Sequence, residues 1–163
     1  MANSRCGSLK LEEQILDTWR INNRINLYML DAIAPEALGA VSTSKGRSVG
    51  QQFAHLHNVR LMWFKPSAPD LLHGLEKIEN AQATDKELLR SSLEASGGAI
   101  EEMIRRGLET GNIKYFKPHP VAFLGYIISH DGYHRGEIGI ILNQSGHPLD
   151  KKVSYGMWEW GSR

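Results

Sequence analysis

The chain has 163 residues, of which 41% are hydrophobic, and this length suits a single domain, residues 1–163, around one core. Its 19 Lys and Arg against 18 Asp and Glu give a net charge of +1, and the absence of a concentrated basic run argues against a nucleic-acid partner. No apolar run reaches the roughly 18–20 residues of a membrane span and the N-terminus lacks a secretory signal, so we expect a cytoplasmic protein. The first residues, about 1–7, are expected to form a flexible tail, and their single cysteine, Cys6, cannot form an internal disulfide.

After this tail, hydrophobic residues recur at spacings near three and four, which predicts a first helix from about Ser8 to Ala34. Pro35 should end this helix, because proline cannot continue a helix and disfavours helix in the residue before it. A second helix is predicted after Ser48, a suitable N-cap, and Pro66 should end it.

A third helix is predicted from about Thr84 to Gly111, with a stripe of apolar residues along one face. Thr84 can cap its start together with Glu87 three residues later, and glycine is a common helix end. Gly97 and Gly98 lie in its middle, where each weakens a helix by roughly 1 kcal/mol. They indicate either a close approach by a neighbouring helix or a local kink.

A fourth helix should start near Pro120 and stop near Gly146, because proline is tolerated in a first turn and glycine is frequent at a helix end. Four helices without a competing strand pattern predict an all-α four-helix bundle. The connection over residues 66–83 is long enough to cross a helix of about 27 Å, so the second and third helices are expected to run parallel. Trp158 and Trp160 predict that the C-terminal tail folds back over the bundle or binds a partner.

The stretch HDGYHRGE, residues 130–137, places two histidines four residues apart on the fourth helix. Counting about 100° per residue puts His130 and His134 within the apolar arc, so both should face the core, one above the other. Two stacked imidazoles on such a face can satisfy their nitrogens by sharing one cation. Histidine pairs at this spacing are also common without a metal, so the pair alone leaves both interpretations open.

A third ligand could come from the second helix, which carries His55 and His57 on opposite edges of its apolar arc. Each lies roughly 100° from the centre of that arc, so periodicity does not choose between them. The remaining histidines, His73, His119 and His147, fall in loops or after a helix stop, and we interpret them as surface residues.

Two segments together resemble the DinB-like superfamily of small metal-binding four-helix bundles. They are SVGQQFAHLHNVRLMWF on the second predicted helix and HDGYHRGEIGIILNQSGHP on the fourth, and WRINNR on the first is also similar. The pattern of that superfamily pairs Ala-His-Leu with a later His-x3-His-Arg-Gly. The resemblance implies metal ligands at His55, His130 and His134, an up-down-down-up bundle, and a homodimer.

The site that the resemblance implies has no cysteine near it, whereas closed structural zinc sites normally have four protein ligands. We therefore expect an open site for a divalent ion, zinc, nickel or iron(II), with a position for water or substrate. Such an ion could generate a hydroxide near neutral pH or hold a thiol as its thiolate. Relatives in the superfamily include transferases that use low-molecular-weight thiols, which implies a thiol as a candidate cosubstrate.

Two acids, Asp131 and Glu137, flank the histidines on the fourth helix. Glu137 projects about 20° from His130 and could orient a ligand imidazole or act as a general base; the alternative is a solvated surface acid. Arg135 projects away from the metal face, and we interpret it as an ion-pairing or packing residue.

Two functions follow from this reading. The first is a metal-dependent enzyme that transfers a thiol or hydrolyses a small molecule, with a substrate that the sequence does not identify. The alternative is a noncatalytic metal-binding or dimeric interaction protein that keeps the site for stability. Both predict a bound metal, and neither calls for a nucleic-acid or membrane partner.

Overall fold

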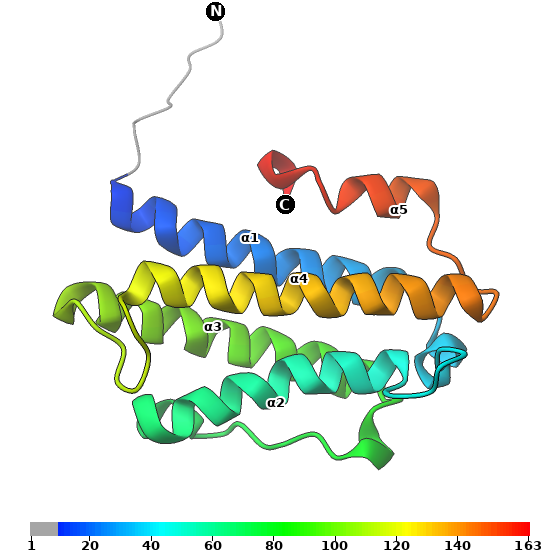
Figure 1. Ribbon diagram of the computed structural model, residues 1–163, viewed down its shortest axis with the longest axis horizontal. Helices are drawn as coiled ribbons and strands as arrows, with labels where there is room; N and C mark the ends of the chain where they lie inside the picture. The colour runs from blue at the N-terminus through cyan, green and yellow to red at the C-terminus, as the bar shows by residue number, and fades with distance from the viewer. Residues whose placement is uncertain (1–9) are drawn as a thin grey trace, which may run out of the picture.

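The computed structural model describes residues 10–163, in which four long helices pack together as predicted (Figure 1). The expected flexible tail at residues 1–7 with Cys6, and the expected helix start at Ser8, lie outside the described residues. None of the described helices has both the length and the apolar character that a membrane span requires.

The bundle consists of α1 Leu11–Ala32, α2 Val49–Ser67, α3 Lys86–Thr110 and α4 Pro120–Gln144. A short helix, α5 Lys151–Gly156, follows the bundle. The connections and the C-terminus contain single 3-10 turns at Pro35–Gly39, Pro69–Leu72, Asn80–Gln82 and Trp160–Ser162.

Two helices end close to the prolines that were expected to stop them. α1 ends at Ala32 rather than Ala34, because the residues just ahead of Pro35 are extended. α2 runs through Pro66 and ends at Ser67, so the predicted end is wrong by one residue. The helix stops directly after this proline, because proline has no N–H for the helical hydrogen bond and its ring crowds the carbonyl of the preceding turn.

Side chains cap the first turns of α2 and α3. Ser48 forms the cap predicted for α2, in a reciprocal capping box with Gln51. At α3 the cap is Asp85, whose carboxylate accepts a hydrogen bond of 2.9 Å from the third backbone N–H of the helix. The predicted cap at Thr84 with Glu87 is therefore wrong, since aspartate is the stronger N-cap and lies one residue further along.

Contacts between α2 and α3 advance in the same direction along both helices. At the start of α2, a Cβ added to Gly50 would lie 1.7 Å from the carbonyl oxygen of Ala83, just before α3. At the other end, the hydroxyl of Ser67, the last residue of α2, donates to the carbonyl oxygen of Lys114, a few residues beyond α3. The connection between them accordingly runs back along the bundle in Figure 1.

Gly97 marks a close approach between α3 and α1. Its carbonyl oxygen accepts a hydrogen bond from the Trp19 indole (2.8 Å), and an added Cβ would lie 2.1 Å from Nδ2 of Asn23. The same addition at Gly98 would meet nothing within 4 Å. Of the two roles that the sequence left open, close approach by a neighbouring helix therefore holds at Gly97.

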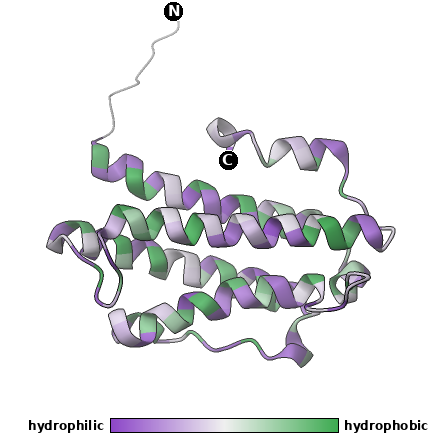
Figure 2. Cartoon of the chain, in the orientation of Figure 1, coloured by the Kyte–Doolittle hydropathy of each residue, from purple (hydrophilic) through white to green (hydrophobic). Residues whose placement is uncertain are grey.

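The core has two apolar clusters with a polar layer between them. The first cluster includes Leu30, Phe53, Leu89 and Ile138, and the second includes Trp19, Phe64, Ile104 and Phe123. The polar layer contains buried side chains from all four long helices: Asn22, Asn26, Arg60, Ser96 and Asp131. Figure 2 shows the consequence on α4, where a hydrophilic middle separates two hydrophobic ends.

The C-terminal segment folds back onto α1, as predicted. The guanidinium of Arg163 lies 3.9 Å from the ring centroid of Tyr28, and the Arg163 carbonyl oxygen accepts a hydrogen bond from Arg24 (2.6 Å). This packing does not bury the two tryptophans: Trp158 remains 79% exposed and Trp160 36% exposed.

Candidate metal centre

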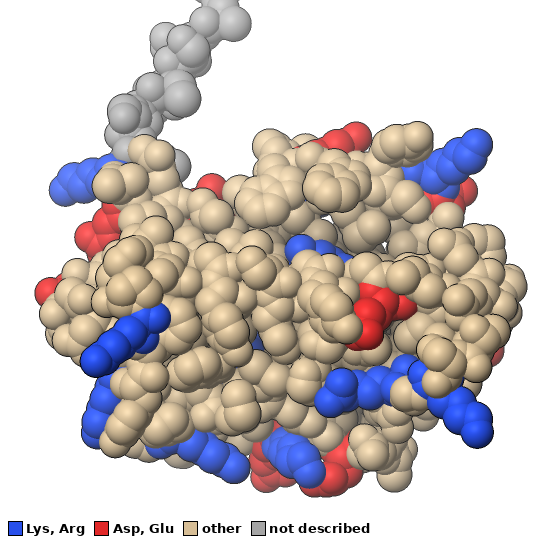
Figure 3. Space-filling view, in the orientation of Figure 1, with Lys and Arg blue, Asp and Glu red and all other residues tan. Residues whose placement is uncertain are grey.

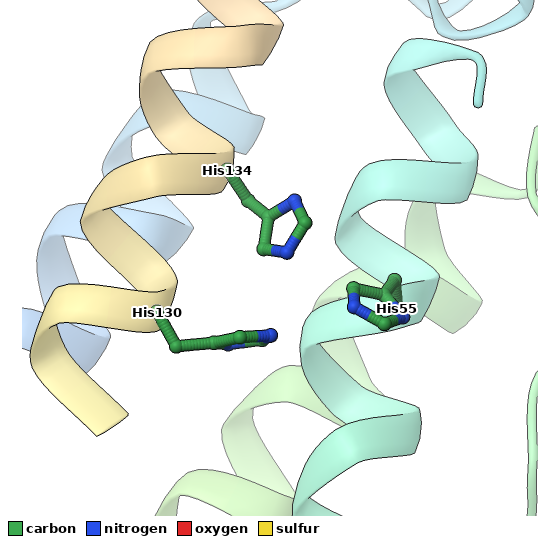
Figure 4. Close-up of side chains that lie close together, drawn as sticks. All are labelled: His55, His130 and His134. Carbon is green, nitrogen blue, oxygen red and sulfur yellow. The ribbon is translucent and has the colours of Figure 1, made fainter. Parts of the chain in front are cut away.

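Three histidines converge between α2 and α4 (Figure 4). His55 comes from α2, and His130 and His134 lie one turn apart on α4. Each offers one ring nitrogen, and these three atoms all lie within 4.8 Å of one another. The ring centroids are 4.6 Å apart for the pair on α4, and they lie 5.3 Å and 4.7 Å from the centroid of His55. This spacing allows one cation between the rings to reach all three nitrogens.

His57, the alternative on α2, lies away from this cluster. Its Nδ1 is 3.0 Å from the carbonyl oxygen of Ser92, and its Nε2 is 2.8 Å from that of Glu76. The ring therefore joins α2 to α3 and to the connection between them. The structure thus brings His55, and not His57, to the pair on α4, a choice that helical periodicity left open.

The other histidines lie outside the cluster. His73 and His147 are exposed, as expected. His119 caps α4, since its Nδ1 accepts a hydrogen bond of 3.1 Å from the backbone N–H of Ala122.

The proton of His134 is held on the ring nitrogen Nδ1. This atom is 2.6 Å from Oε1 of Gln52 and 3.1 Å from Oε2 of Glu137, and both of these oxygens are acceptors. The other oxygen of Glu137 accepts a hydrogen bond from the Tyr133 hydroxyl (3.0 Å). With its Nδ1 donating, His134 has the lone pair of Nε2 free for a cation.

Asp131 lies beside His130 and is completely buried. Its Oδ2 accepts hydrogen bonds from Asn22, Asn26 and Arg60 (2.9, 2.7 and 3.2 Å). Its Oδ1 is 3.5 Å from Nδ1 of His130, and among the described residues neither of these two buried atoms has a hydrogen-bond partner. The unused oxygen of a buried carboxylate therefore favours a proton on Nδ1 of His130, which leaves Nε2 of that ring for a cation.

Arg60 supplies the positive charge behind Asp131. Its guanidinium is fully buried, donates to the carbonyl oxygen of Leu93 (2.9 Å) and the hydroxyl of Ser96 (3.2 Å), and lies 5.0 Å from the ring of Trp19. Burial alone would raise the pKa of Asp131, but the charge of Arg60 and the nearby hydrogen bonds lower it below the ordinary value. The carboxylate therefore stays ionised in the core.

Arg135 lies outside the metal face, as predicted, since its guanidinium donates to the amide oxygens of Asn22 and Asn26 on α1. These two asparagines and Arg60 belong to one buried network around Asp131, which helical periodicity did not predict. A signal was present, because Arg60 falls seven residues after Phe53, on the same stripe of α2.

His55 and His134 are held in the neutral form that a metal ligand requires. Burial is the largest cause that lowers the pKa of His55, to about 4, and the positive charge of Arg47 adds to it. Burial also lowers the pKa of His134, followed by the charge of His130. The lone pairs of these two rings are therefore available at neutral pH.

Comparison with known families decides what kind of bundle this is. A model of the DinB family matches residues 1–151. The chain belongs to the DinB family. No curated protein and no solved structure gave a match. The residues that match the DinB model contain α1 to α4 and all three clustered histidines, so membership and geometry are both compatible with a metal-binding protein.

The donor set of this DinB protein fits a divalent transition metal. Neutral imidazoles suit zinc, nickel and iron(II). Within residues 10–163, no fourth histidine, cysteine, aspartate or glutamate belongs to the group of ligand atoms around His55, His130 and His134. The neighbouring acids, Asp131 and Glu137, instead face the Nδ1 atoms of the rings.

Proposed function

We propose that the protein is a metal-dependent enzyme, which uses an open three-histidine site to activate a thiol or water for transfer or hydrolysis on a small molecule. The observation that carries this proposal is the group of three imidazole nitrogens within 4.8 Å without a fourth protein ligand in the described chain. Structural sites normally have four protein ligands, whereas catalytic sites keep one position for water or substrate. When bound, zinc, nickel or iron(II) would act as a Lewis acid that lowers the pKa of a water or thiol ligand.

The residues around the histidines prepare the site before an ion arrives. Gln52 and Glu137 keep the proton of His134 on Nδ1, and Asp131 favours the same tautomer of His130. The Nε2 atoms of His130 and His134 then each keep a lone pair that can bind the cation. The carboxylate of Glu137 is 35% exposed beside His134, and we assign it the role of accepting a proton from the thiol or water.

The up-down-down-up order of the bundle is part of this proposal, because it sets α2 antiparallel to α4. The support comes from contact pairs that run in opposite directions: Gln52 reaches His134, whereas Trp63 meets Phe123 (5.4 Å between centroids). A homodimer and a cytoplasmic location stay predictions. The alternative function, a noncatalytic metal-binding or interaction protein, uses the same site.

Elemental analysis of protein purified without chelators or a polyhistidine tag tests the metal site. We expect stoichiometric metal in the wild type, or after addition of Zn²⁺ or Ni²⁺, and loss of that metal in His130→Ala and in His55→Ala. His73→Ala is the matched control, because it removes an exposed histidine away from the cluster and should keep the metal. A wild type that takes up neither ion would overturn the proposal.

A second measurement separates the enzyme from the noncatalytic alternative. Protein loaded with Co²⁺ should change its visible spectrum when 2-mercaptoethanol is added, because an open position admits the thiol. A spectrum that is indifferent to the thiol would favour the noncatalytic alternative.

A further inference from the structure

A cleft of about 320 Å³ lies next to the three-histidine cluster, between the loop at residues 42–47 and the C-terminal half of α4. Gln52 and Glu137 line it, and these are the two residues that hold Nδ1 of His134. One end of the cleft is therefore formed by the two side chains that orient His134, a proposed metal ligand.

Two basic residues of the loop, Lys45 and Arg47, also line this cleft. Both are exposed, and in the described chain neither side chain has a hydrogen bond or an ion pair. Arg47 differs in this respect from the other arginines of residues 10–163, each of which has an acceptor partner. These are Arg20, Arg24, Arg60, Arg90, Arg105, Arg106, Arg135 and Arg163. Figure 3 shows basic side chains over this loop, next to an acidic group on α4.

The loop that carries these charges is tied to the bundle at several points. The backbone N–H of Val49 donates to the carbonyl oxygen of Ala40 (2.9 Å), which closes the loop at its base. The backbone N–H of Thr43 donates to the amide oxygen of Gln144 on α4 (3.2 Å). Arg47 directly precedes the capping box of α2, so its backbone has a fixed position.

The opposite wall of the cleft gives a bound molecule its orientation. Ile140 lines it and is 55% exposed, which leaves an apolar surface beside the two cations. Glu137 stands at the side of the histidines and would repel a second negative charge there. An anionic group would therefore lie at the loop, with an uncharged part of the molecule directed toward the histidines.

We propose that this cleft is the substrate subsite of the three-histidine centre, and that it selects a small organic anion whose carboxylate or phosphate pairs with Arg47 and Lys45. This inference rests on the proposed function and names its substrate class. The guanidinium offers a carboxylate or phosphate two parallel N–H donors.

The first test compares two thiols on the metal-loaded protein by calorimetry at low salt. 3-Mercaptopropionate carries a carboxylate, whereas 2-mercaptoethanol carries a hydroxyl. We expect the anionic thiol to bind about tenfold more tightly, which is the size of one hydrogen-bonded pair with a charged group. Arg47→Gln should abolish this difference, Arg47→Lys should keep part of it, and Lys65→Gln, an exposed cation on α2 outside the cleft, should leave it unchanged.

The second test uses metal-free protein, so that its outcome does not depend on the metal site. Butyrate, propyl phosphate and butyramide are titrated while the backbone NMR signals of residues 42–47 are followed. Stronger shifts with either anion than with butyramide support the subsite, and the stronger of the two anions identifies the group that it selects. Equal shifts with all three compounds, or equal affinity for both thiols on loaded protein, would overturn the subsite even if the metal binds as proposed.

Discussion

In the two apolar clusters, each buried side chain is held by many interchangeable contacts, whereas in the polar layer each buried group has specific partners. Leu30 or Phe123 is stabilised by the area that it removes from water, and a swap of similar volume typically costs less than about 1.5 kcal/mol. Arg60 and Asp131 are both completely buried charges, and each has lost its hydration. Such a pair adds little net stability, yet the loss of one partner leaves the other uncompensated.

This difference shows what the polar layer does. An apolar layer of the same shape would stabilise the bundle at least as well, so stability alone does not explain a buried ion pair in its middle. The layer lies at the level of α4 that carries His130 and His134. Oδ1 of Asp131 faces Nδ1 of His130. We infer that the layer exists to orient the site, while the clusters on either side hold the helices together.

The largest expected effect on stability comes from Arg60→Met, which removes the cation of the polar layer. It leaves Asp131 buried without its cation, and we expect a loss of about 3–5 kcal/mol in the free energy of unfolding. Urea unfolding of the metal-free protein measures it. Arg90→Met removes a partner from an exposed ion pair and should barely move the urea midpoint.

A double variant sharpens this result. Arg60→Met combined with Asp131→Asn removes both charges, so its loss should be smaller than the sum of the two single losses. Strict additivity would mean that the two side chains do not depend on each other, against the contact at 3.2 Å.

The apolar clusters were largely predictable from the sequence, and the polar layer was not. Helical periodicity depends on hydrophobic residues at spacings of three and four, and these gave four helices whose ends are mostly within a few residues of the observed ones. It treats Arg60 as an interruption, because an arginine is rarely buried without a partner. The partner, Asp131, lies on another helix, and no local pattern reveals that pairing.

The histidine cluster shows the same limit. Periodicity placed His130 and His134 on the core face but left His55 and His57 equivalent, since both flank the apolar arc of α2. His57 contacts backbone carbonyl oxygens, whereas His55 joins the cluster. Only the positions of α3 and α4 in the folded bundle distinguish these two histidines. The similarity to the DinB-like pattern supplied the choice that single-helix geometry could not.

The second effect tests whether the polar layer orients the site. Asp131→Asn would place an amide N–H against Nδ1 of His130. This favours the tautomer with its proton on Nε2, and a protonated Nε2 has no lone pair for the cation. We expect Zn²⁺ affinity to fall about 10–100-fold. Competition with a zinc chelator measures it, on protein whose circular dichroism confirms that it is folded.

Two comparisons keep this result interpretable. Arg60→Met also weakens the polar layer but leaves the contact between Asp131 and His130, so its affinity should fall less. Glu137→Gln should have a small effect as well, because Gln52 still accepts the proton of His134 at 2.6 Å. Equal losses in Arg60→Met and Asp131→Asn would mean that the layer acts only through stability.

The smallest expected effect is at Gly97, where α3 approaches α1 next to the polar layer. The neighbouring Gly98 serves as the control. Gly97→Ala puts a methyl group against the amide of Asn23, and we expect a loss of about 1–3 kcal/mol in the free energy of unfolding. Gly98→Ala adds the same group in open space within a helix and should stabilise the protein by up to about 1 kcal/mol. Urea unfolding of both variants gives the signs. If Gly97→Ala were also stabilising, α1 and α3 would have room to move apart, and the close approach would not be what holds Asn23 and Trp19 in register with the layer.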